Sequence, residues 1–237
     1  MALPNLNNTP QYDVTIPSTG KKTRYRPYLV AEEKLLLLAL EEGSDVSIAK
    51  ATLSLIEACV DDIDAFNLTA TDVEYLFLKL RSKSVGETTL LAFKCGTCEG
   101  RNDVSVNINN VEMPEYNSAD NMIQISDDYI VEMRPMKYKD IIDRGLIGSS
   151  SKNMTETFYN IIRYSLYALH TEDEKILFSE EEESEVILFL NNMTTAQFSL
   201  LRKYVENLPS IEELVEFNCS DCGNKNVVTI KGLHDFF

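Results

Sequence analysis

Four of the five cysteines occur in two Cys-x-x-Cys pairs, a spacing that is typical of metal-binding knuckles. The first pair is Cys95 and Cys98, and the second is Cys219 and Cys222. Four thiolates are a common ligand set of structural zinc, which they surround as a tetrahedron. The sequence therefore predicts one structural zinc ion per chain, in a closed site without an open position for a substrate.

The sequence around the two pairs favours a ribbon. Each pair follows a short apolar segment that ends in Phe93 or Phe217, and each is followed by a polar turn, residues 99–102 or 223–226. A second strand is expected after each turn, over residues 103–108 and 227–230. Two such hairpins can bring four sulfurs to one ion, so we expect a split zinc ribbon.

Other chemistry of the four cysteines stays open at this point. Two disulfides, an iron–sulfur cluster and reduced surface thiols all use cysteine, and redox-active pairs share the same spacing. Ligand type and the repeated motif favour zinc. The fifth cysteine, Cys59, falls on an apolar helix and is expected to be a buried, inert thiol in a reducing compartment.

The second pair follows the first only after about 120 residues, whereas compact ribbons separate their pairs by roughly 15–20. We therefore expect the intervening chain to be a large insertion that the metal closes at its base. The expected layout is a flexible arm (1–10), a β-hairpin with a helical bundle (11–86), the first knuckle hairpin (87–108), an inserted hairpin and helical region (109–210) and the second knuckle hairpin (211–237).

Hydrophobic periodicity indicates an α+β fold of helical bundles and β-hairpins. Hairpins are expected over residues 12–26 and 122–133. Leu35–Leu40 is too short to cross a bilayer and is predicted to lie in a buried helix. His170 is expected at the end of an aromatic helix. The predicted helices cover residues 30–42, 46–60, 69–82, 137–144, 154–170, a stretch that begins at 179–183, and 196–207.

Composition narrows the class of partner. A net charge of −16 argues against a broad nucleic-acid surface, because phosphate binding depends on Lys and Arg. The first residues have neither a basic start nor an apolar run, so no secretory signal is expected there. No phosphate-binding loop or catalytic constellation is evident, so enzyme activity is not predicted. We expect protein partners, with neither nucleic acid nor membrane.

Three short motifs near the N-terminus resemble the start of the baseplate hub proteins of T4-like phages. They are Pro17-Ser18-Thr19-Gly20, Arg26-Pro27-Tyr28 and Glu32-Glu33-Lys34-Leu35, and the resemblance is densest over about residues 10–45. It implies a hub component of the contractile-tail baseplate, or a chaperone-like factor that assembles the hub and tape-measure proteins. It implies synthesis in the host cytoplasm, a place in the virion tail as a second location, and an oligomer as one assembly state. No catalytic residue is carried over.

Two functions from different classes follow. The first is a zinc-stabilised tail assembly protein that works through protein contacts, and the alternative is a zinc-ribbon nucleic-acid adaptor or phage transcription factor. The aromatic helix at 154–170 is a further candidate interface. The main candidate contact segment could equally pack on the first helix; it consists of Arg24, Tyr25, Arg26, Pro27 and Tyr28.

Overall fold

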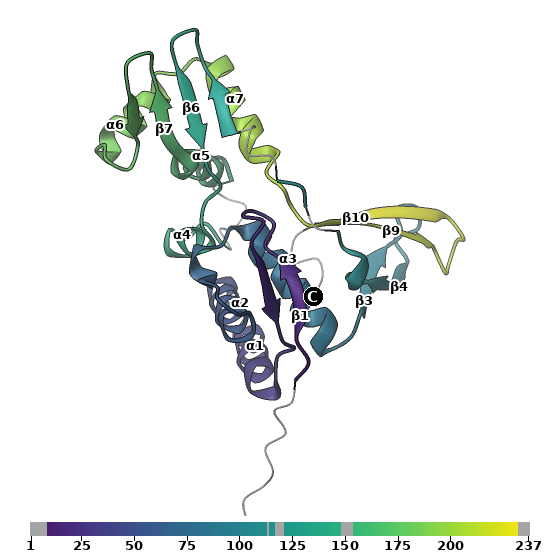
Figure 1. Ribbon diagram of the computed structural model, residues 1–237. Helices are drawn as coiled ribbons and strands as arrows, with labels where there is room; N and C mark the ends of the chain where they lie inside the picture. The colour runs from purple at the N-terminus through teal and green to yellow at the C-terminus, as the bar shows by residue number, and fades with distance from the viewer. Residues whose placement is uncertain (1–8, 113, 117–120, 148–153, 232–237) are drawn as a thin grey trace, which may run out of the picture. The chain divides into compact units, whose positions relative to one another are not determined.

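The computed structural model describes residues 9–112, 114–116, 121–147 and 154–231 (Figure 1). Of the predicted N-terminal arm, residues 1–8 lie outside this part of the chain. The chain forms two compact units, one of Met1–Pro114 with Ser210–Phe237 and one of Glu115–Pro209.

The first unit begins with a hairpin and three helices. Gly20, with φ of 67°, closes the turn of the hairpin, and its N–H donates to the carbonyl of Ile16 at 2.8 Å. Gly43, with φ of 70°, ends the first helix as predicted, and Ser44 and Thr69 cap the next two α-helices. The elements are β1 (Tyr12–Thr15), β2 (Lys22–Tyr25), α1 (Val30–Glu42), α2 (Asp45–Cys59), η1 (Ala65–Asn67) and α3 (Ala70–Ser84).

Contacts from all three N-terminal motifs hold this unit together. The carboxylate of Asp72 is fully buried in the first turn of α3 and accepts hydrogen bonds from the backbone N–H of Ser18 at 2.8 Å and its hydroxyl at 2.6 Å. Arg26 pairs with Glu32 at 2.8 Å and also donates to the carbonyl of Ala58. The motifs therefore fix the hairpin turn to α3 and the end of β2 to α1 and α2.

The prediction that Leu35–Leu40 is a buried helix was wrong in part. Leu36 is buried on α1, whereas Leu35, Leu37 and Leu38 are all at least half exposed. The helix packs along one side on α2, so a run of six consecutive apolar residues necessarily turns half of its side chains outward.

Two long hairpins complete the first unit (Figure 1). In each, an antiparallel pair of seven-residue strands is closed by a Cys-x-x-Cys turn, and the strand register is the same in both. The elements are β3 (Thr88–Lys94), β4 (Arg101–Asn107), η2 (Ile108–Asn110), β9 (Glu212–Asn218) and β10 (Lys225–Lys231).

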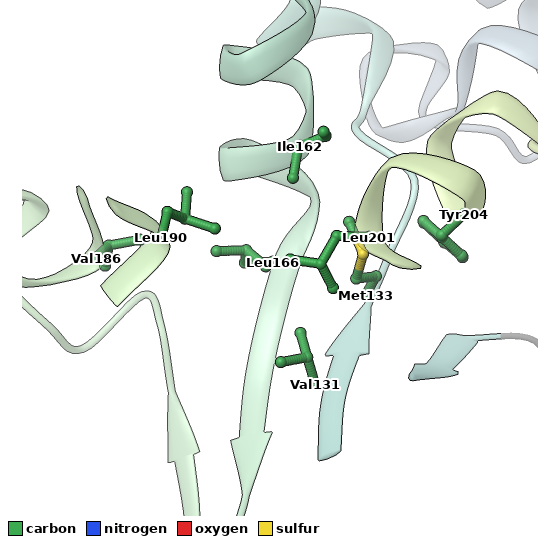
Figure 2. Packing of buried hydrophobic residues seen from close by; sticks show 8 residues of the cluster. All are labelled: Val131, Met133, Ile162, Leu166, Val186, Leu190, Leu201 and Tyr204. Carbon is green, nitrogen blue, oxygen red and sulfur yellow. The ribbon is translucent and has the colours of Figure 1, made fainter. Parts of the chain in front are cut away.

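The second unit has a four-stranded antiparallel sheet in the order β5-β6-β7-β8. Its apolar core, shown in Figure 2, joins the sheet to helices α5, α6 and α7 through Val131, Met133, Ile162, Leu166, Val186, Leu190, Leu201 and Tyr204. The elements are β5 (Met122–Gln124), β6 (Ile130–Met133), α4 (Tyr138–Asp143), α5 (Met154–Ser165), β7 (Leu166–His170), β8 (Lys175–Leu177), α6 (Glu183–Asn191) and α7 (Thr195–Glu206).

The prediction of one helix over residues 154–170 was wrong in its second part. The chain leaves α5 at Ser165 and continues as β7, between β6 and β8. The place predicted for His170 was wrong for the same reason, since it lies on this strand and contacts Glu132 at 3.0 Å. Strand pairing on both sides of β7 outweighs the helical periodicity that the aromatic residues suggest. The predicted α+β class is confirmed.

Among the residues that the structure describes, no helix is long and apolar enough to cross a membrane.

Candidate metal centre

Each Cys-x-x-Cys turn folds back on its own hairpin through the same pair of backbone hydrogen bonds. The N–H of Cys95 donates to the carbonyl of Gly100 at 2.9 Å, and the N–H of Glu99 donates to the carbonyl of Cys95 at 3.0 Å. The second hairpin repeats both bonds, from Cys219 to Asn224 and from Gly223 to Cys219. The two hairpin tips are therefore copies of one local structure.

One residue of each tip has a left-handed backbone. In the second tip this is Gly223, with φ of 75°, which suits glycine because it has no Cβ. The corresponding position in the first tip is Glu99, with φ of 59°. Left-handed backbone is unfavourable by about 1–2 kcal/mol for a residue with a Cβ. Glu99 therefore makes the conformation of the first tip less favourable in free energy than a glycine at this position would.

The four sulfurs lie together at the tips of the two hairpins. The Sγ atoms of Cys95 and Cys222 are 3.7 Å apart, and those of Cys98 and Cys219 are 3.6 Å apart. All four ligand atoms lie within 4.8 Å of one another. Zinc–sulfur bonds of about 2.3 Å give a tetrahedron with edges of about 3.8 Å. The two short distances match this edge, so the arrangement is compatible with one tetrahedral ion.

The same distances bear on the other chemistry that the sequence left open. A disulfide needs sulfurs about 2.05 Å apart, and all five cysteines are free. A cluster with two or more irons would hold the thiolates that bind different irons farther apart than a single ion does. Cys95 and Cys219 are buried, whereas Cys98 and Cys222 are exposed. The geometry is best suited to one ion that both hairpins share.

Two asparagines cross between the hairpins and contact the thiols of the opposite tip. The side chain of Asn102 accepts from the N–H of Ser220 at 2.8 Å, and its amide donates to the Cys219 sulfur at 3.6 Å. In the other direction, Asn226 accepts from the N–H of Gly96 at 3.0 Å and donates to the Cys95 sulfur at 3.6 Å. Each hairpin thus supplies hydrogen bonds to a buried thiol of its partner.

Backbone hydrogen bonds favour the thiolate form of these two cysteines. The N–H groups of Cys98 and Thr97 lower the pKa of Cys95 to about 6. The N–H groups of Cys222 and Asp221 lower the pKa of Cys219 in the same way.

The pKa values of the two exposed cysteines, Cys98 and Cys222, are raised instead of lowered. The N–H of Gly100 lowers the pKa of Cys98, but the neighbouring thiols Cys222 and Cys219 raise it more, to about 12. Four thiols this close cannot all ionise by themselves, and a divalent cation would remove the repulsion between them.

Aromatic packing joins the hairpins behind the sulfurs. The rings of Phe93 and Phe217 are stacked, with centroids 5.7 Å apart and an angle of 21° between their planes. The next core positions along the strands, Leu91 and Val215, are buried as well. A small apolar core therefore supports the cysteine cluster from the side of the strands.

Cys59 lies apart from this cluster and is buried on α2, as predicted. Burial raises the pKa of its thiol to about 11, which fits an inert core residue.

The candidate contact segment 24–28 lies at the end of β2. The side chain of Arg24 is 60% exposed, whereas Tyr25 is buried and its ring contacts that of Tyr12 at a tilt of 35°. Arg26 is held by Glu32, and the N–H of Tyr28 donates to the hydroxyl of Ser84 at 2.9 Å. Contact between this segment and a partner stays a prediction.

A comparison with protein families finds one that fits nearly the whole chain. The family model described as T4 bacteriophage base plate protein matches residues 9–237. The chain belongs to this family. The match spans both units of this baseplate protein, including both Cys-x-x-Cys hairpins. Searches of curated proteins and of solved structures found no match.

Sequence reasoning found the four cysteines of the baseplate protein but missed the two asparagines. The signal was present, because Asn102 and Asn226 each follow the second cysteine of their pair by the same number of residues. Asparagine is common in turns for reasons of backbone conformation alone. Its contact with the opposite hairpin becomes visible only once the two tips are placed together.

Proposed function

We propose that this baseplate protein is a component of the tail hub, or a factor that assembles the hub, and that it works through protein contacts with one structural zinc ion per chain. The observation that carries the zinc assignment is the cluster of four sulfurs, whose spacing fits a closed tetrahedral site. The family match supports the place in the baseplate. A site whose four ligands are all thiolates leaves no position for a reacting water, so the proposed role of the ion is structural.

The zinc ion would hold together two hairpins that are distant in sequence. Each hairpin alone is a two-stranded sheet, which is marginally stable in water. Binding energy from the metal is available to folding, because the ligands are not gathered in the unfolded chain. The ion thereby gives the first unit a rigid surface on which other baseplate proteins can assemble.

The nucleic-acid alternative receives less support from the charges around the cysteines. Arg101 lies 3.5 Å from Asp103, and Lys225 lies 2.8 Å from Glu216. Lys231 pairs with Glu212 at 2.6 Å. These basic side chains are each paired with a carboxylate across or along the hairpins, so they do not form the continuous basic surface that phosphate binding needs.

Native mass spectrometry of the chain co-expressed with the hub and tape-measure proteins of its phage tests the proposal. We expect one zinc ion per chain and a stable complex with at least one of these proteins. Cys219→Ser should abolish zinc binding, whereas Cys59→Ala, a matched change of a cysteine outside the cluster, should keep it. A chain that binds no zinc, or that retains nucleic acid and none of the phage proteins, would overturn the proposal.

The same experiment tests the contact segment. Arg24 is the most accessible charged residue of this segment, and its partner Asp61 is also exposed. If the segment contacts a partner, Arg24→Glu should weaken the complex while Lys22→Glu, on the same strand, weakens it less. Equal effects would show that only general charge matters.

Assembly of a tail takes place in the host cytoplasm, which is where we propose that the chain first acts. A hub component would stay in the virion tail, whereas an assembly factor would leave it. Mass spectrometry of purified particles distinguishes these two cases.

A further inference from the structure

Helix α1 exposes an unusual amount of apolar surface. Leu35 is 60% exposed, Leu37 is 51% exposed and Leu38 is 50% exposed. Val30, at the start of the helix, is 79% exposed. Single exposed leucines are common, but several on one helix mark a surface that another molecule covers.

The opposite side of α1 already has its partner. Leu36 and Ala39 are buried, and α1 and α2 pack against each other. Over residues 35–40 apolar side chains therefore surround the helix, and the charged residues of α1 lie nearer its two ends. A helical segment that is apolar on all sides is typical of a buried helix, whereas the surface helix of a soluble protein has one apolar stripe.

The outward residues have the spacing of a helix-packing seam. Ala31, Leu35 and Leu38 are exposed and follow one another at intervals of four and three residues. Residues at this spacing line one face of a helix and pack against the apolar stripe of a second helix. The geometry therefore favours a helical occupant over an extended strand.

Charge on α1 indicates the electrostatic character of the occupant. Glu41 and Glu42 lie exposed in the last turn, where the helix dipole is negative and where α1 has no basic residue. Within the described residues, neither glutamate takes part in an ion pair. Two carboxylates at the negative end of a helix are unfavourable until a cation approaches them.

We propose that α1 docks an amphipathic helix of another protein, with an apolar stripe on Ala31, Leu35 and Leu38 and with Lys or Arg beside Glu41 and Glu42. This inference deepens the proposed function and rests on it for the kind of partner, a neighbouring protein of the tail. A second copy of the chain is a poorer occupant, because each copy has a net charge of −16.

A pair of synthetic helical peptides of about 20 residues tests the surface directly. Both have leucines along one face, and the remaining positions are lysine in one peptide and glutamate in the other. Fluorescence anisotropy of the labelled lysine peptide should show binding to the full chain, and the glutamate peptide should not bind. The double variant Leu35→Ser/Leu38→Ser should weaken binding by about 10-fold or more, because it removes apolar contact without changing charge.

Two further variants separate docking from general attraction to an acidic protein. Leu90→Ser/Leu214→Ser removes two leucines of the hairpins that are more exposed than Leu35 and Leu38, and it should leave the affinity unchanged. Glu41→Gln/Glu42→Gln should lower the affinity several-fold and reduce its dependence on salt. Equal losses in both leucine pairs, or no binding of the lysine peptide, would overturn the inference.

Analytical ultracentrifugation of the chain without peptide tests whether a second copy of the chain covers α1. A dimer that Leu35→Ser/Leu38→Ser dissociates would replace the proposed partner by another copy of α1. Failure of the inference and failure of the proposed function are also distinguishable. If Leu35→Ser/Leu38→Ser keeps both its zinc and its phage partner in native mass spectrometry, the docking surface is wrong while the assembly function stands.

Discussion

Asn102 lies beside the cysteine cluster and links the two hairpin tips by hydrogen bonds. Its side-chain oxygen accepts from one hairpin tip while its nitrogen donates both to the sulfur of Cys219 and to the carbonyl of Gly100. Hydrogen bonds to metal-bound thiolates reduce their repulsion and fix their positions. The residue is also buried, so its polar groups have no water to replace these partners.

The change Asn102→Asp tests this role with almost no change of shape. It replaces an N–H donor by a negative oxygen beside the sulfur, so we expect zinc affinity to fall by about 10–100-fold, the range typical of residues that support metal ligands. Competition with a chromogenic zinc chelator measures the affinity. The matched control is Asn107→Asp on the same strand, where the side chain is exposed and accepts from the N–H of Asn109. If the two variants bind zinc equally well, the asparagine contact is not important for the metal.

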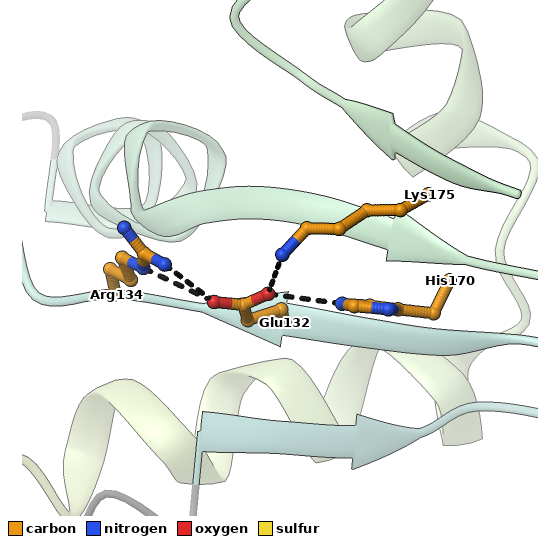
Figure 3. Close-up of polar contacts among 4 residues, drawn as sticks. All are labelled: Glu132, Arg134, His170 and Lys175. Carbon is orange, nitrogen blue, oxygen red and sulfur yellow. Dashed lines mark hydrogen bonds and ion pairs between the residues drawn. The ribbon is translucent and has the colours of Figure 1, made fainter.

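At the scale of elements, one carboxylate connects three strands of the second unit, as Figure 3 shows. Glu132 on β6 contacts Lys175 of β8 at 2.7 Å and His170 of β7 at 3.0 Å. Arg134 binds its other oxygen at 2.8 Å. Burial raises the pKa of Glu132, but the hydrogen bonds from Lys175, His170 and Arg134 outweigh this effect and lower the pKa from 4.5 to about 2.

This shift predicts how the stability of the sheet changes with pH. The folded pKa is below the unfolded one, so the contribution of Glu132 is complete above about pH 4.5 and is lost as the pH falls toward 2. Glu132→Gln should therefore destabilise the protein at pH 7, by about 1–3 kcal/mol, and the difference from the parent should shrink over that acidic range. Thermal melts at each pH measure it. Glu174→Gln, in the exposed turn before β8, is the control, and a difference that is constant with pH would contradict this account.

Local patterns predicted some elements well and others poorly. The predicted end of the first helix at residue 42 depends on local chemistry, because Gly43 adopts the left-handed backbone that stops a helix, and the structure confirms it. The change from α5 to β7 depends on pairing with β6, which lies far earlier in the chain, as well as with β8, which follows directly after a short turn. Helical periodicity alone therefore did not reveal it. The exposure of Leu35, Leu37 and Leu38 was missed because an apolar run predicts burial but does not say whether the covering surface belongs to the same chain.

The candidate metal site was likewise predicted only in part. The four cysteines were recognisable from spacing alone, and the structure confirms that they cluster. The contacts of Asn102 and Asn226 cross from one hairpin to the other and required the structure. Metal identity rests on ligand chemistry, and it stays a proposal.

At the scale of the whole molecule, the second unit and the two hairpins of the first unit differ in what holds them together. The second unit has an apolar core of its own, built on β6, β7 and three helices, whereas the hairpins of the first unit meet at the cysteine cluster and the stacked rings of Phe93 and Phe217. Removal of a metal should therefore affect the two parts unequally.

Hydrogen exchange with and without a zinc chelator measures this difference. After chelation we expect the amides of β3, β4, β9 and β10 to exchange at least about 10-fold faster, because each pair of strands becomes an isolated hairpin. Amides of β6 and β7 should keep their protection. The Cys59→Ala variant should respond like the parent, and Cys219→Ser should exchange rapidly even without chelator. Equal loss of protection in both units would show that the metal supports the whole chain.

The order of the two hairpins along the chain has a consequence for biosynthesis. Cys95 and Cys98 leave the ribosome early, but their partners Cys219 and Cys222 follow only after the whole unit Glu115–Pro209 has been made. Until then only two of the four candidate ligands have been synthesised, and β3 and β4 form only one half of the ribbon. Capture of the proposed zinc ion would therefore be a late step, which needs a chain that has been translated through to residue 222.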